Sequence, residues 1–306
     1  MNSHREGLLS VHTSVLIFGL TALFSKLISL SAIEITFLRS IFAVLAIAIF
    51  IKFLKESLLL KRTNDYFIAL LLGFFLATHW VTYFHSMQVS SVAIGIISLY
   101  SYPVITVFLE PLFHGEQPHI KDIISAIAVL FGIYLLVPEL SIDNNTTQGI
   151  LWGVLSAFLF SLRNIIHRRH FKAYPARHAL LYQGLFVILL LLPFSADIIT
   201  EVSQQQWLML ILLGVFFTAL PHTLFANSLL HLKAKTVGLI GCMQVVYGTL
   251  FAAVFLAELP DWKTVAGGLI VISAAGYETL STVKQTPSPE THPSSESQDP
   301  TNHQPE

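Results

Sequence analysis

Ten long apolar stretches make up most of this sequence and leave few folds open to it. They cover residues 8–30, 34–54, 66–86, 91–111, 120–138, 149–168, 178–195, 206–228, 235–257 and 263–283. Each is close to the roughly 20 residues that a helix needs to cross a bilayer. Polar and apolar residues do not alternate within them, which argues against the strands of a membrane barrel. Only 11% of all residues are charged, whereas soluble domains carry about 25%. The sequence therefore predicts an all-α integral membrane protein with ten transmembrane helices.

Lysine and arginine fall almost entirely on one side of these predicted spans. If the N-terminus is cytoplasmic, thirteen of the 17 lie inside: Arg5, Lys52, Lys55, Lys61, Arg62, Lys121, Arg168, Arg169, Lys172, Arg177, Lys233, Lys235 and Lys284. Only Lys263 lies outside, and Lys26, Arg39 and Arg163 lie within spans. Because cytoplasmic loops are enriched in cations, we predict that both termini are cytoplasmic. Residues 284–306 lack large apolar side chains and are predicted to be a disordered cytoplasmic tail.

A short polar segment occurs twice, as FHGEQPHIK at 113–121 and FLAELPDWK at 255–263. The offset of 142 residues relates several further pairs: Gly7 and Gly149, Ser14 and Ser156, Phe18 and Phe160, Lys26 and Arg168. We therefore predict two five-span repeats, residues 7–138 and 149–283. Because five is odd, the second repeat must enter the membrane from the opposite side, as in many secondary transporters.

The polar segment itself is interpreted as a device that starts a helix. Pro118 and Pro260 each open a predicted span, where proline suits the first helical turn. Glu116 and Glu258 lie just ahead, where a carboxylate favours the positive end of the helix.

The order of these features resembles the drug/metabolite transporter superfamily, in particular its EamA-type members. The matching segments are FGLTALFSK (18–26), TFLRS (36–40), YPVITVFLEPLFHGE (102–116) and ELPDW (258–262). The resemblance covers about residues 7–283 and implies the family's fold and its role in moving small metabolites across a membrane. The second repeat departs from the pattern in VVYGT (245–249), which has no proline where Pro103 stands in the first. This difference argues against equal flexing of the two halves.

Polar side chains recur at helical spacing in several spans. His79, Thr82, Tyr83 and Ser86 share one face of the third span, as the steps of three and four residues require. Such faces turn toward the bundle interior or a watery cavity. The candidate substrate-binding residues are His79, Trp80, Tyr83, Ser98, Tyr102, Arg163, Asn164, His222 and Gln244. For serines, close packing of helices is the favoured interpretation, and aromatic side chains also fill membrane cores.

The three intramembrane cations have almost no carboxylates beside them in the span interiors. For Lys26 and Arg39, near the predicted external face, snorkelling or pairing with carbonyls at helix ends is the favoured interpretation. Arg163 lies nearer the cytoplasmic side, beside Asn164. Because a substrate carboxylate could neutralise an unpaired cation, the pattern favours amino acids or amphipathic organic acids over cationic drugs.

Prolines interrupt two of the predicted spans. Pro103 in the fourth and Pro221 in the eighth allow a kink, so both residues, together with Gly248, are candidate gating hinges. Proton coupling needs a titrating group within the membrane, where His79 and His222 are the candidates. Facilitated export and proton exchange therefore both stay open.

Other classes of protein find little support in the sequence. The spans contain no HExxH motif, no GxSxG motif and no paired aspartates, and the chain carries no ATP-binding signature. HRRH at 167–170 fits an orientation signal better than a metal cluster. We predict a secondary transporter that exports small organic metabolites by alternating access in a bacterial inner membrane. It is expected to need no cofactor, metal or nucleic acid and to have no enzyme activity, and a homodimer is compatible. The alternatives are a receptor or scaffold and a proton-coupled multidrug carrier.

Overall fold

The computed structural model describes residues 3–114, 120–137, 141–171, 174–195, 197–232 and 234–285. These residues form helices and connecting turns, with no β-strand among them. Seven helical segments are long and apolar enough to cross a membrane: His4–Leu27, Ala32–Phe53, Thr63–Val89, Val92–Glu110, Asn145–His170, Ala176–Phe194 and Gln204–His231. Ile123–Leu136 and Met243–Leu256 are shorter apolar helices. The all-α membrane class agrees with the prediction, while the count of ten spans stays a prediction. The predicted tail lies outside the described residues from position 286 onward.

The helices follow the order of the predicted spans. Those of the first predicted repeat are α1 (Ser3–Thr21), α2 (Phe24–Leu27), α3 (Ala32–Phe53), α4 (Thr63–Val89), α5 (Val92–Leu99), α6 (Tyr102–His114) and α7 (Ile120–Leu136). The second contains α8 (Asn145–His170), α9 (Ala176–Leu191), η1 (Leu192–Phe194), η2 (Asp197–Thr200), α10 (Gln204–Gly214), η3 (Val215–Ala219), α11 (Leu220–His231), α12 (Ala234–Gly241), α13 (Met243–Leu256) and α14 (Trp262–Gln285). Ser31 and Ser203 begin α3 and α10 with capping boxes, which satisfy free N–H groups of the first turn.

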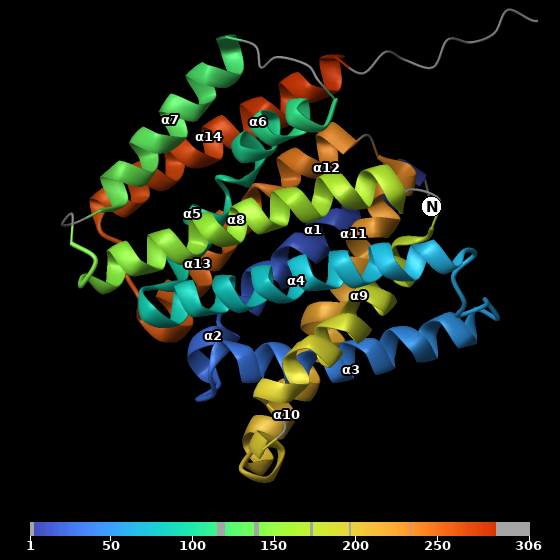
Figure 1. Cartoon of the computed structure of the whole chain (residues 1–306). Helices are drawn as coiled ribbons and strands as arrows, with labels where there is room; N and C mark the ends of the chain where they lie inside the picture. The colour runs from blue at the N-terminus through green and yellow to red at the C-terminus, as the bar shows by residue number, and fades with distance from the viewer. Residues whose placement is uncertain are drawn as a thin grey trace, which may run out of the picture.

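Helices of the two predicted repeats interleave in one bundle. In Figure 1, α4 crosses the middle of the bundle; it packs against α3, α5, α8 and α9, while α1 packs against α11 and α13. At one end α7 lies beside α14 and α6, and at the other end α10 packs against α3 (Figure 1). Because helices of each predicted repeat pack against helices of the other, the two repeats share one core.

Two predicted spans are broken at positions related by the same 142-residue offset. In the first repeat α5 ends at Leu99 and α6 begins at Tyr102, just ahead of Pro103. In the second, α12 ends at Gly241 and α13 begins at Met243. The second break forms without a proline. The lack of a proline in the second repeat therefore does not predict whether this span is continuous.

Hydroxyl groups of each repeat bind carbonyl groups at the break in the other. Tyr100 Oη donates a hydrogen bond to the carbonyl of Gly241 at 2.5 Å. Ser161 Oγ shares its proton between the carbonyl of Tyr102 at 3.0 Å and that of Ala157 in its own helix at 2.8 Å. A carbonyl without a partner is costly in an apolar interior. The bond from Tyr100 explains how the helix can break at Cys242 without a proline.

The predicted interruption at Pro221 is a π-helical turn, η3, followed by α11. Proline has no N–H, so the carbonyl of Phe217, four residues earlier, lacks its α-helical donor. Thr21 Oγ1 of α1 shares its proton between that carbonyl and the carbonyl of Ile17, each at 2.9 Å. Ser14 Oγ donates to the carbonyl of Pro221 at 2.8 Å. The distortion is thus stabilised by the other repeat, while gating by Pro103 and Pro221 stays a prediction.

The polar segment ahead of α14 does not start this helix through Glu258 and Pro260, as was predicted from the sequence. Asp261 Oδ1 accepts the amide of Thr264 at 2.7 Å and caps α14, and Pro260 lies two residues ahead of the helix rather than in its first turn. Glu258 Oε2 instead accepts the amide of Val92 at 2.9 Å, at the start of α5. The helix-starting interpretation of Glu258 is therefore wrong, because its carboxylate joins the two repeats. Glu116 and Pro118 of the first copy lie outside the described residues.

Glycines allow α8 to approach α4 and α5 closely. A Cβ at Gly153 would lie 2.5 Å from the Cβ of Ser98, so Gly153→Ala must push the helices apart. We expect this variant to lose about 1–3 kcal/mol of stability, the usual cost of overpacking. Thermal unfolding in detergent measures the loss. Gly241→Ala is the control, since a Cβ there meets nothing within 4 Å; equal melting temperatures for the two variants would contradict the close contact.

Candidate substrate cavity

A cavity of about 470 Å³ lies between helices of both predicted repeats. In the first predicted repeat, α1, α4, α5 and α6 contribute to its walls. In the second, the walls come from α8, α9, η3, α11, α12 and α13. Eight of the nine candidate substrate-binding residues line it: His79, Trp80, Tyr83, Tyr102, Arg163, Asn164, His222 and Gln244. The structure thus brings these residues together, and their contact with a substrate stays a prediction.

Ser98 is the candidate that does not reach the cavity. It is fully buried and lies where α5 meets α8, against Gly153. This placement agrees with the packing interpretation favoured for serines. Gly248 has a similar place, because a Cβ there would lie 2.2 Å from Ile96 Cδ1; α13 can approach α5 closely only without a side chain at this position.

Several lining residues were missed by the sequence reasoning. They include Phe18, Thr21, Tyr100, Phe160, His167 and Phe217. A usable signal existed for Phe18 and Phe160, which are related by the repeat offset and both line the cavity. No such sequence signal marks Tyr100, because its position in the cavity wall depends on a hydrogen bond from its hydroxyl group to Gly241 in the other repeat.

Arg163 enters the cavity wall from α8 and is held by two amide side chains. Its Nε and Nη2 donate to Gln183 Oε1 at 2.9 and 2.7 Å, and its Nη1 donates to Asn164 Oδ1 at 3.0 Å. Gln183 is fully buried in α9, so it fixes the guanidinium in position. Among the described residues, no carboxylate lies within 4 Å of Arg163.

Both histidines of the cavity have a fixed proton position in their neutral form. Ser156 Oγ donates its only proton to the carbonyl of His79 at 2.9 Å, so at 2.8 Å from Nδ1 it must accept from that ring. His222 Nδ1 lies 2.7 Å from the carbonyl of Thr218, which can only accept. Each ring therefore carries its proton on Nδ1, and Nε2 is left as a hydrogen-bond acceptor.

Arg39 is buried behind the cavity wall rather than extended toward the lipid headgroups. Its side chain is 2% exposed, and its Cζ lies 4.2 Å from the ring centre of Trp80 and 4.5 Å from that of Phe84. Its Nε and Nη2 have no hydrogen-bond partner in the described part of the chain. The snorkelling expectation is therefore wrong for Arg39, because its charge is stabilised by aromatic faces inside the bundle.

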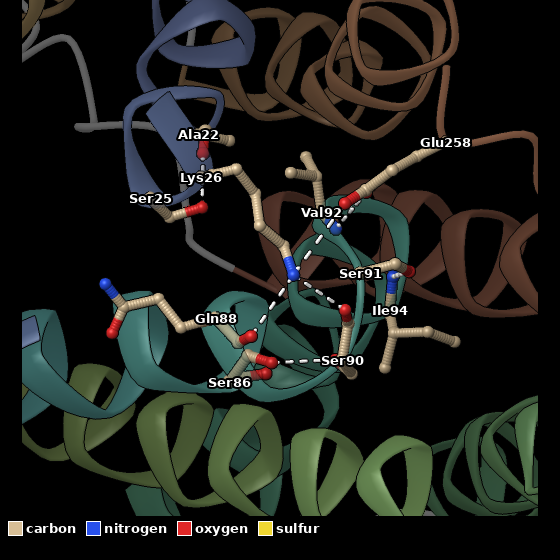
Figure 2. Close-up of polar contacts among 10 residues, drawn as sticks. All are labelled: Ala22, Ser25, Lys26, Ser86, Gln88, Ser90, Ser91, Val92, Ile94 and Glu258. Carbon is tan, nitrogen blue, oxygen red and sulfur yellow. Dashed lines mark hydrogen bonds and ion pairs between the residues drawn. The ribbon is translucent and has the colours of Figure 1, made fainter. Parts of the chain in front are cut away.

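Lys26 makes the contacts with helix-end carbonyls that the sequence suggested, and a carboxylate of the second repeat lies close by. Its Nζ donates to the carbonyls of Gln88 and Ser90 at 3.1 and 2.9 Å and lies 3.8 Å from Glu258 Oε1. Figure 2 shows Lys26 extending from α2 toward the end of α4, with Glu258 reaching the start of α5 from the opposite repeat. We call Lys26, Glu258 and these backbone groups the Lys26–Glu258 latch. Neither of the two side chains lines the cavity.

The cavity reaches the surface near the start of α9. Its lining includes Ala176 and Leu229, which are both exposed, and Arg177, which pairs with Glu56 of the connection between α3 and α4. The hydrogen bond from Arg177 holds the pKa of Glu56 below its usual value. The pair therefore stays charged at neutral pH and is lost as the pH falls through the lowered pKa of the carboxyl group.

Known proteins show similarity over most of this chain. The chain matches the EamA-like transporter family twice, at residues 5–137 and at residues 147–277. An uncharacterized transporter of Bacillus subtilis is 28% identical over 87% of this chain and 87% of its own length. The pseudopaline exporter CntI of Pseudomonas aeruginosa is 23% identical over 80% of this chain and 85% of its own. One solved crystal structure is similar over 90% of this chain and 98% of that chain, with a TM-score of 0.61 at 17% identity, a likeness of fold alone.

Proposed function

The chain belongs to the EamA-like transporter family, and on that premise we propose that it exports small organic metabolites by alternating access. The observation that carries the proposal is the cavity, whose walls come from both family matches. An aqueous or substrate-filled hollow between two repeats is where secondary transporters bind their cargo. The chain is thus an integral membrane transporter, and its substrate and direction are the proposed part.

The two ends of the cavity differ in the way that alternating access requires. The lining reaches the exposed residues Ala176 and Leu229, which are cytoplasmic in the topology we propose. Beyond Thr21, at the end of α1, the Lys26–Glu258 latch ties α2, α4 and α5 of one repeat to the segment ahead of α14 of the other. In the proposed cycle this latch holds the external side shut while the cytoplasmic side is open.

The proposed topology has ten spans in two inverted halves, with both termini in the cytoplasm of a bacterial cell. It is supported by the asymmetric placement of lysine and arginine and by the two family matches, which lie head to tail in the sequence. Export is supported by the relative named as a pseudopaline exporter. In that direction the substrate enters the cavity from the cytoplasm.

Flux through purified protein tests the proposed function. Liposomes that contain the protein are loaded with single amino acids or amphipathic organic acids, and their release is measured with and without a pH gradient. We expect saturable release of at least one compound above that from empty liposomes. An effect of the gradient indicates proton exchange, and its absence indicates facilitated transport. Release that never exceeds the empty control for any of these compounds contradicts the proposal.

A further inference from the structure

The charges around the cavity are unbalanced. Among the described residues that line it there are two arginines, Arg163 and Arg177, and no aspartate or glutamate. Arg177 is neutralised at the mouth by Glu56, whereas Arg163 contacts only neutral amide oxygens. Behind Trp80, a lining residue, Arg39 adds a second charge without a counterion. An isolated cation in an apolar interior is costly, so this wall favours an anionic ligand.

The remaining donors of Arg163 suit a carboxylate. The guanidinium has five N–H groups, of which three are engaged by Gln183 and Asn164. One N–H is left on each terminal nitrogen, and two such donors can bind both oxygens of a carboxylate. Because Gln183 is fully buried, the orientation of the guanidinium is set before a ligand arrives, which lowers the entropy cost of binding.

The two histidines offer the complementary chemistry. With their protons on Nδ1, His79 and His222 each leave Nε2 as an acceptor, so the neutral cavity can receive a hydrogen-bond donor from the ligand. His79 stacks on Phe160 with ring centres 4.7 Å apart, and Phe160 lies edge-on to Tyr102 at 5.0 Å. These aromatic walls suit an apolar or aromatic ligand body.

We propose that Arg163 binds the carboxylate of a small amphipathic acid, and that Nε2 of His79 or His222 accepts a hydrogen bond from an ammonium or hydroxyl group of the same molecule. This inference rests on the proposed function and names the substrate class, which is an amino acid or hydroxy acid with an apolar side chain. Arg163 is the residue that determines specificity for the anion. Arg39 is a positioning residue, which acts through Trp80 and adds positive potential to the wall.

Four compounds with the same phenyl ring test each contact separately. Phenylalanine carries a carboxylate and an ammonium group, phenyllactate a carboxylate and a hydroxyl, phenylpropionate only a carboxylate, and phenethylamine only an amine. Binding to purified protein in nanodiscs is measured by calorimetry. We expect the first two to bind best, phenylpropionate about tenfold more weakly through loss of one hydrogen bond, and phenethylamine to bind least. Equal affinity of phenethylamine and phenylalanine overturns the proposal, and so does a failure of all four to bind.

The variant Arg163→Gln isolates the anion contact. We expect it to weaken binding of phenylalanine about 10- to 100-fold, because charge-assisted hydrogen bonds are lost, and to abolish the preference for phenylalanine over its carboxamide. Arg163→Lys keeps the charge and should retain that preference with weaker affinity. Arg169→Gln is the control, because Arg169 lies on the same helix and is exposed. Melting temperatures show which variants are folded.

The outcomes separate this inference from transport itself. If folded Arg163→Gln loses affinity equally for the acid and the carboxamide, or not at all, the carboxylate site is wrong. Release of other metabolites from liposomes by the wild-type protein would then still support the proposed function. If Arg163→Lys loses the preference as completely as Arg163→Gln, the charge of Arg163 is not what recognises the ligand.

Discussion

Glu258→Ala is expected to expose the cavity to the external solution about 10- to 100-fold more often than in the wild-type protein. The substitution removes the hydrogen bond to the amide of Val92 and the attraction to Lys26. Hydrogen bonds to charged groups contribute about 1.5–3 kcal/mol, and about 1.4 kcal/mol changes an equilibrium tenfold. The conformation with a closed external side is therefore less populated, whereas the contacts at the cytoplasmic mouth are unchanged.

Reaction of a cysteine in the cavity measures this shift. Ala226 lines the cavity, so Ala226→Cys in a Cys242→Ser background reports access of a membrane-impermeant maleimide from outside. Glu201→Ala is the matched control, because it removes an exposed carboxylate on the same predicted side. A labelling rate in Glu258→Ala no higher than in this control would show that the latch does not hold the external side shut.

A charge swap makes the test of the latch sharper. Lys26→Glu combined with Glu258→Lys keeps an ion pair, yet we expect it to label as fast as Glu258→Ala. Lys26 donates to two carbonyls and Glu258 accepts an amide, so each position needs its own sign of charge. If the swapped pair labels as slowly as wild type, attraction between the side chains alone holds the latch.

Arg39→Met is expected to raise stability by about 1–3 kcal/mol, the usual cost of buried polar groups without partners. Nε and Nη2 of Arg39 have no hydrogen-bond partner in the described structure, and methionine fills similar space between Trp80 and Phe84. Arg39→Lys should be less stable than wild type, because an ammonium is more strongly hydrated and cannot stack on the rings as a guanidinium does. Thermal unfolding in detergent compares the three proteins.

Transport by the same variants separates stability from function. If Arg39 adds positive potential to the cavity wall, Arg39→Met should raise the KM for an organic acid while kcat changes little. A methionine variant that is less stable than wild type would contradict the energetic account of Arg39. One that is more stable with unchanged KM would show that its charge does not reach the ligand.

The sequence was sufficient to predict which faces of the helices carry polar residues. His79 and Tyr83, one turn apart on α4, both line the cavity, because helical spacing determines which residues share a face. The scarcity of carboxylates within the spans is what indicates that Arg163 has no counterion. The helical class also followed directly from the length of the apolar stretches.

Contacts between the repeats could not be read from local patterns. The local sequence assigns Glu258 to the helix that follows it, yet its carboxylate binds the amide of Val92, 166 residues away in sequence. For Arg39 the sequence predicts a reach to the headgroups or to helix-end carbonyls, since it does not show that Trp80 and Phe84 offer two ring faces. The break at Cys242 could not be predicted from proline positions. Proline shows where a helix is weakened from within, whereas this break is stabilised by Tyr100 of the other repeat.

The sidedness of two positions tests the inverted arrangement most directly. Single cysteines at Ser141, between α7 and α8, and at Lys284, near the end of α14, are introduced separately into the Cys242→Ser protein. Intact cells are then treated with an impermeant maleimide. We expect labelling at position 141 in intact cells and labelling at position 284 only after the membrane is opened. Labelling of both positions from the same side would contradict an odd number of crossings in the second half, and with it the inverted pair of repeats around one cavity.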